Sequence, residues 1–141
     1  MAAETKQLIE LFELKRRDIE DEYLRFNRQM LSKSKFSQDE EATIRQRIDI
    51  LLDKCIESMA KNDDNILLDY TRQITQARIA AGYNTDAILK LWEWGIEFFG
   101  KLVEENLIAS TEKAINARYL RSLLTRAKLV VISTHLTQFE Q

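Results

Sequence analysis

The side chains that could do chemistry are few and lie far apart in the sequence. The chain of 141 residues has one histidine, His135, close to its end, and one cysteine, Cys55, in an apolar row of a predicted helix. Covalent catalysis needs a nucleophile activated by a nearby base, and a di-iron bundle needs two Glu-x-x-His pairs. Neither pattern is present, and three scattered glycines make no phosphate-binding loop. We therefore predict that the protein is not an enzyme and has no catalytic residue, metal or cofactor.

The composition indicates one helical domain. Hydrophobic residues make up 45% and charged residues 31%, with no proline and three glycines, a balance that favours long helices. The net charge of −2 argues against a nucleic-acid surface, and no apolar run reaches the ~18 residues of a membrane-spanning helix. A single cysteine fits a reducing compartment. We expect a single all-α domain over residues 1–141, cytoplasmic, with neither nucleic acid nor membrane as a partner.

The most apolar stretch spans residues 88–104. Projected on a helix, its polar residues fall into one narrow strip: Lys90, Glu93, Glu97, Lys101 and Glu104. A helix that is apolar over about two thirds of its circumference belongs in the interior. The pattern predicts about five helices and no sheet, in a globin-like or bundle arrangement around a central buried helix at about residues 85–105.

Local signals place several helix ends. The run Ser37-Gln38-Asp39-Glu40 is typical of a capping box at the start of a helix. Gly82 suits the left-handed position after a helix, and Asn84 or Thr85 can cap the helix that follows. The turn NDDN, which begins at Asn62, is predicted to cap another helix, which buries one stripe formed by Leu67, Tyr70, Ile74, Ala77 and Ala81.

Three residues of the central helix are candidates for a cavity or a close contact. Trp92 and Phe99 can line a ligand cavity, although packing in the core is the default for aromatic side chains. Gly95 costs roughly 1 kcal/mol relative to alanine in mid-helix. Its presence predicts that another backbone or a small ligand approaches closely there.

The last helix carries a second apolar row formed by Leu129, Ile132, Leu136 and Phe139. Its 3-4-3 spacing is typical of a two-stranded helical seam. A helix that leaves its own domain should become polar, whereas this one gains apolar residues. We therefore predict that the four residues form a homodimer interface, in an input domain whose output domain lies outside this chain.

The stretch ARIAAGYNTDAILKLWEWGIEFFGKL, followed by a long final helix, resembles the N-terminal sensory domains of stressosome scaffold proteins, the RsbR-like family. The resemblance covers about half of the chain and transfers no functional residue. It implies a globin-like fold without haem, dimerisation through the last helices, stressosome partner proteins and a helical linker to a sulfate-transporter/anti-sigma-antagonist domain, which this chain lacks.

The expected function is therefore that of a non-catalytic, dimeric sensor domain in bacterial stress-response signalling, which passes a signal through its last helix. Two alternatives stay open. One is a globin-like sensor that binds haem or bilin, and the other is a helical adaptor that docks a kinase or phosphatase.

Overall fold

The computed structural model describes residues 3–31, 35–107 and 111–140, with side chains from residue 5 to residue 138 within those ranges. Five helices account for nearly all of them, and none of the described residues forms a strand, so the all-α prediction is confirmed. The helices are α1 (Ala3–Met30), α2 (Gln38–Lys61), α3 (Asn65–Ala80), α4 (Thr85–Asn106) and α5 (Thr111–Glu140).

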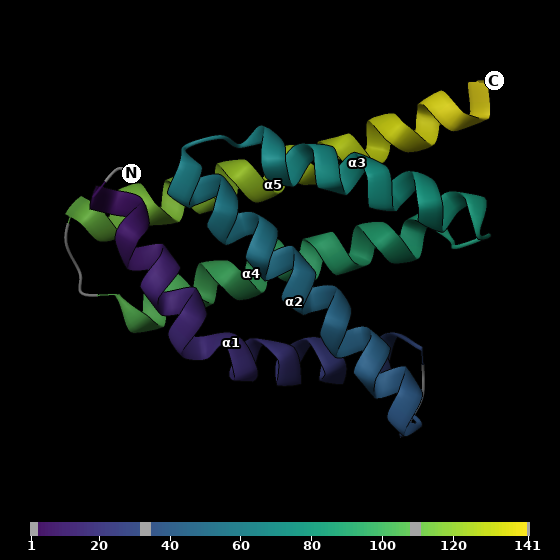
Figure 1. Cartoon of the computed structure of the whole chain (residues 1–141), viewed down its shortest axis with the longest axis horizontal. Coiled ribbons are helices and arrows are strands. Elements are labelled where there is room, and N and C mark those ends of the chain that lie inside the picture. Colours follow the sequence, from purple (N-terminus) through teal and green to yellow (C-terminus); the bar gives the residue numbers. More distant parts are fainter. Residues whose placement is uncertain (1–2, 32–34, 108–110, 141) are drawn as a thin grey trace.

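The helix α5 joins the other elements together. It packs against α3, α4 and α1, whereas α4 packs mainly on α5 and touches α1. Two ion pairs lie on the flanks of α5. Lys128 contacts Glu93 of α4 at 3.2 Å, and Arg126 contacts Asp64, the residue just before α3, at 2.6 Å. Positions two residues apart on a helix point in nearly opposite directions, so α3 and α4 lie on opposite sides of α5. Figure 1 shows α2 running obliquely to these helices and α1 changing direction midway.

The core draws on every helix, and α4 supplies much of its aromatic content. The predicted polar strip of α4 is exposed along its whole length, while Ile88, Trp92, Phe99 and Val103 are buried. Aromatic rings connect α4 to α1. Trp94 stacks on Phe98 at a centroid distance of 4.9 Å and on Phe26 of α1 at 5.5 Å, and Phe99 contacts Phe12 of α1 at 5.2 Å.

The predicted stripe of α3 is only partly correct. Leu67 is buried, and Tyr70 and Ile74 are half-buried, but Ala77 and Ala81 are exposed. The buried positions are instead Leu67, Thr71 and Thr75. The Thr71 hydroxyl donates to the carbonyl of Leu67 at 2.8 Å within the same helix. Because this bond satisfies the hydroxyl, threonine can face the core with its methyl group.

The predicted helix ends are confirmed where they depend on local chemistry. The Ser37 hydroxyl accepts from the Glu40 N–H at 3.1 Å, and the Glu40 carboxylate accepts from the Ser37 N–H at 3.0 Å, which completes the capping box. Gly82 has φ +88°, a conformation that favours glycine. The Asn84 side chain caps α4 by accepting from the Asp86 N–H at 2.8 Å.

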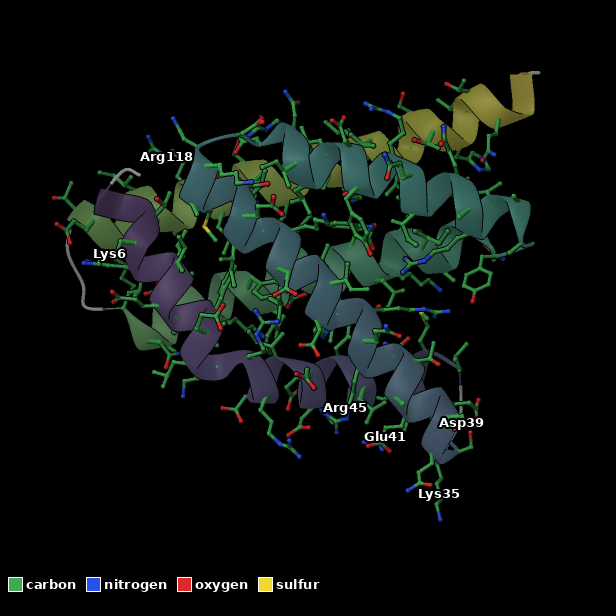
Figure 2. All side chains as sticks on the ribbon, in the orientation of Figure 1. Lys6, Lys35, Asp39, Glu41, Arg45 and Arg118 are labelled. Atoms are coloured by element: carbon green, nitrogen blue, oxygen red, sulfur yellow. The ribbon has the colours of Figure 1, made fainter. Side chains whose placement is uncertain are left out.

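Ion pairs hold the middle of α1 against α2. Arg16 contacts Asp49 at 3.2 Å and Asp53 at 2.8 Å, both on α2. Arg45 of α2 contacts Asp21 of α1 at 2.8 Å and Glu41 of its own helix at 3.3 Å. Figure 2 labels Arg45 and Glu41 next to each other where α2 passes α1. Arg16, in the cationic run Lys15-Arg16-Arg17, therefore joins α1 to α2.

Candidate functional site

A cavity of about 40 Å³ lies inside the bundle where the five helices converge. Its aliphatic wall consists of side chains from α2, α3, α4 and α5, namely Ile48, Leu51, Ile74, Leu91 and Leu124. A single water-sized group needs roughly 10–15 Å³ measured in this way. The cavity therefore has room for about three such groups, which is far less than a porphyrin requires.

The part of the wall that α4 forms includes all three residues that the sequence singled out on that helix. Trp92, Gly95 and Phe99 line the cavity together, because their spacing of three and four residues places them on one face of the helix. Further rings come from Trp94 of α4, Tyr23 of α1 and Tyr70 of α3, which sequence analysis did not assign to a site. Both tryptophans of the chain thus line one cavity.

The explanation for Gly95 needs correction. A Cβ atom added at this position would meet only the Phe99 ring, at 4.0 Å, which is ordinary van der Waals contact. Gly95 is buried, yet no neighbouring backbone presses against it. The predicted close helix contact is therefore wrong. The missing side chain instead leaves open space next to Phe99, on the cavity side of α4.

Two arginines give the cavity its charge. Arg47 of α2 and Arg78 of α3 belong to its lining, which contains no aspartate or glutamate. The Arg47 guanidinium donates to the Tyr83 hydroxyl at 2.8 Å and lies 5.6 Å from the centre of that ring. Burial raises the pKa of the Tyr23 hydroxyl, and the positive charges of Arg78 and Arg47 oppose that rise. The same opposition acts on Tyr70, so both arginines lie close enough to act on the phenols.

The predicted seam on α5 is exposed at two of its four positions. Leu129 is 56% exposed and Leu136 is 55% exposed. Ile132 is half-buried in a groove of about 410 Å³ beside Tyr83 and Leu89. The side chain of Phe139 lies outside the described residues.

A second groove runs along the other flank of α5. It has a volume of about 350 Å³, and Leu68 of α3 lines it together with Leu129 and Val130. The exposed leucines therefore form a low ridge on α5 between two grooves. This ridge and its two grooves are called the α5 face below.

The lone histidine and the lone cysteine occupy different surroundings. The Nδ1 atom of His135 forms a hydrogen bond of 2.7 Å with the Thr85 hydroxyl at the start of α4, and His135 borders the groove of Ile132 rather than the core cavity. Cys55 is buried among apolar side chains, and this burial raises the pKa of its thiol to about 12. These positions suit structural roles for both side chains.

Within residues 3–31, 35–107 and 111–140, no group of three or more histidine, cysteine, aspartate or glutamate side chains is arranged to hold a metal ion. No helix in those ranges is long and apolar enough to cross a membrane. Comparison with known proteins finds no matching family model, no matching curated protein and no matching solved structure. The chain is thus defined by its geometry as a five-helix domain with a small aromatic cavity and an exposed apolar face.

Proposed function

We propose that this chain is a non-catalytic sensory domain that works as a homodimer in bacterial stress-response signalling, as the resemblance to stressosome scaffold proteins implies. The α5 face is its dimer interface, and α5 carries the signal. The observation that carries this proposal is the exposure of Leu129 and Leu136 one above the other on α5, which is also the helix that joins α3, α4 and α1.

The shape of the α5 face supports pairing with a second copy. A contiguous exposed apolar strip normally marks an interaction surface. Here the strip is a ridge with a groove on each side, and helices pack by inserting the ridges of one into the grooves of the other. A two-fold axis through the face would set the ridge of each protomer against a groove of its partner, because an isologous interface presents the same residues twice.

The position of α5 gives such a dimer a route for a signal. Since α5 contacts three other helices, a change in their packing alters the angle or register of α5 against its copy. A ligand can drive this change only if it binds the two arrangements with different affinities. The output is then a rearranged pair of α5 helices, which any attached partner or domain can read.

The oligomeric state tests the proposal directly. We expect the wild type to sediment as a dimer at tens of micromolar. The double variant Leu129→Glu/Leu136→Glu should sediment as a folded monomer, because it places four carboxylates in an apolar seam. Both leucines are mostly exposed, so the substitutions should leave the monomer intact, which circular dichroism will check.

A matched control separates the seam from a general effect of charge. Leu14, 78% exposed on α1, and Leu31, just after α1, also face solvent but lie away from the α5 face. The variant Leu14→Glu/Leu31→Glu should remain dimeric. A wild type that is monomeric at these concentrations, or a control that dissociates as readily as the α5 variant, would contradict the proposal.

A further inference from the structure

The lining of the core cavity combines apolar side chains with two cationic ones. Arg47 and Arg78 line an otherwise apolar space, and neither has a carboxylate partner among the described residues. By contrast, Arg16, Arg45 and Arg126 each form an ion pair at 2.8 Å or less. Both arginines are half-buried, so their guanidinium groups can bind an anion at the mouth of the cavity.

We propose that the cavity is a binding site for a short-chain monocarboxylate, with the carboxylate held by Arg47 and Arg78 and the alkyl tail placed against Trp92, Gly95 and Phe99. The site belongs to a single chain and stands whether or not the chain dimerises. In a dimeric sensor, such a ligand would be the signal.

The chemistry of the wall selects a carboxylate with an apolar tail. A guanidinium presents parallel N–H donors that match the two oxygens of a carboxylate. The hydroxyls of Tyr23 and Tyr70, which belong to the same lining, can donate to an anion as well. Beyond these polar groups the wall consists of aromatic and aliphatic side chains, against which a methylene chain is favourable.

The volume of the cavity limits the length of the tail. At roughly 10–15 Å³ for each group, a cavity of about 40 Å³ takes about three methylene or methyl groups. A carboxylate outside this space and three carbons inside it make a four-carbon acid. Butyrate is therefore the best simple probe, acetate has too short a tail to fill the cavity, and hexanoate is too long to fit.

The two tryptophans provide a built-in probe, because Trp92 and Trp94 both line the cavity. Tryptophan fluorescence of the full chain is titrated with acetate, butyrate and hexanoate, and with n-butanol as the uncharged counterpart. We expect a saturable change in the millimolar range that is strongest for butyrate and at least about tenfold weaker for butanol, since the alcohol lacks the charge-assisted bonds. No saturable change, or equal binding of butanol and butyrate, overturns the proposal.

Variants then locate the site. Arg78→Gln and Arg47→Gln should each weaken butyrate binding by about tenfold, while Arg72→Gln should not. Arg72 lies on the same helix as Arg78 but is exposed and paired with Asp69 at 3.1 Å. Should one of the two arginine variants fail to fold, the other carries the test. Butyrate binding that survives in every folded arginine variant overturns the proposal.

The glycines of α4 test the tail end of the site. Gly95→Ala adds one methyl group to the cavity wall, so it should shift the preference from butyrate toward propionate. Gly100→Ala is the control, because Gly100 is exposed on the same helix with nothing within 4 Å of an added Cβ. An unchanged chain-length preference in Gly95→Ala overturns the placement of the tail, and with it the proposed site.

Discussion

The side-chain oxygen of Ser58, near the end of α2, accepts a hydrogen bond of 3.0 Å from the backbone N–H of Leu67, in the first turn of α3. Early N–H groups of a helix have no partner inside the helix. A residue just before the helix usually satisfies them, and Asp63 does so for the N–H of Asn65 at 3.1 Å. The N–H of Leu67, two residues further into α3, is instead capped by Ser58 of α2. This hydrogen bond links α2 to the start of α3.

Replacing Ser58 by alanine should therefore destabilise the domain. Ser58 and Leu67 are both fully buried, so the variant leaves a buried N–H without its acceptor, at a cost of about 1–3 kcal/mol. Urea denaturation at neutral pH measures the change. Ser122→Ala is the control, since Ser122 is exposed on α5, and it should change the free energy of unfolding by less than about 0.5 kcal/mol. Equal effects of the two substitutions would refute the role given to Ser58.

The contact between Tyr119 and Asp64 should be visible in both stability and its pH dependence. The Tyr119 hydroxyl donates to the Asp64 carboxylate at 2.8 Å and joins α5 to the start of α3. Tyr119→Phe removes this bond and should cost about 1–2 kcal/mol at pH 7, while Arg126 keeps its own bond to Asp64 at 2.6 Å.

At alkaline pH the same substitution should have a second effect. Burial and the Asp64 carboxylate raise the pKa of the Tyr119 hydroxyl. In the unfolded chain a tyrosine loses its proton near pH ~10, whereas folded Tyr119 keeps it. The stability that this phenol contributes is therefore complete below pH ~10 and is lost as the pH rises above it. Between pH ~9 and ~11, the range around the pKa of an unfolded tyrosine, the free energy of unfolding should fall less steeply with pH for Tyr119→Phe than for the wild type. Denaturation curves measured across this range give both slopes. Parallel slopes would mean that Tyr119 ionises normally.

Features that depend on neighbouring residues in the sequence were predictable. The capping box at Ser37 and the left-handed Gly82 need only local chemistry. The exposed strip of α4 follows from helical periodicity, and so does the grouping of Trp92, Gly95 and Phe99 on one wall. The sequence alone was therefore sufficient for the helices and for one side of the candidate site.

Features that depend on how the helices rotate against one another were not predictable. The predicted buried face of α3 left out Thr71 and Thr75, because threonine was treated as a polar residue. Both side chains are in fact buried. The charged part of the cavity needs Arg47 and Arg78, thirty-one positions apart on different helices, and no spacing rule connects them. One weak signal existed, because Arg78 follows Ile74 by four residues and so continues an apolar face of α3.

The thiol of Cys55 should be unreactive in the native protein. Burial raises its pKa to about 12, and the thiolate is the form that attacks a thiol reagent. Native protein at pH ~8 should therefore react with a thiol reagent only as fast as it unfolds, while denatured protein, whose cysteine has a pKa near ~8.5, reacts at once. The absorbance of the released chromophore follows the reaction. Rapid native labelling would mean that the α2 face around Cys55 opens readily.

The last prediction concerns the two glycines of α4, which differ in what an added methyl group would meet. Both lie inside the helix, so replacing either by alanine gains about 1 kcal/mol of helix propensity. At Gly100 nothing lies within 4 Å of the new atom, which faces solvent. At Gly95 the new atom lies 4.0 Å from the Phe99 ring, in a buried position beside the cavity.

Gly95→Ala should consequently be the more stabilising substitution. Filling part of the cavity with one methyl group adds about 0.8 kcal/mol to the gain in propensity, for a total near ~2 kcal/mol against about 1 kcal/mol for Gly100→Ala. Urea denaturation of the two variants and the wild type measures both differences, and equal m-values ensure that the curves are comparable. A destabilised Gly95→Ala would contradict this expectation, because it would mean that the Phe99 ring cannot accommodate the added methyl group.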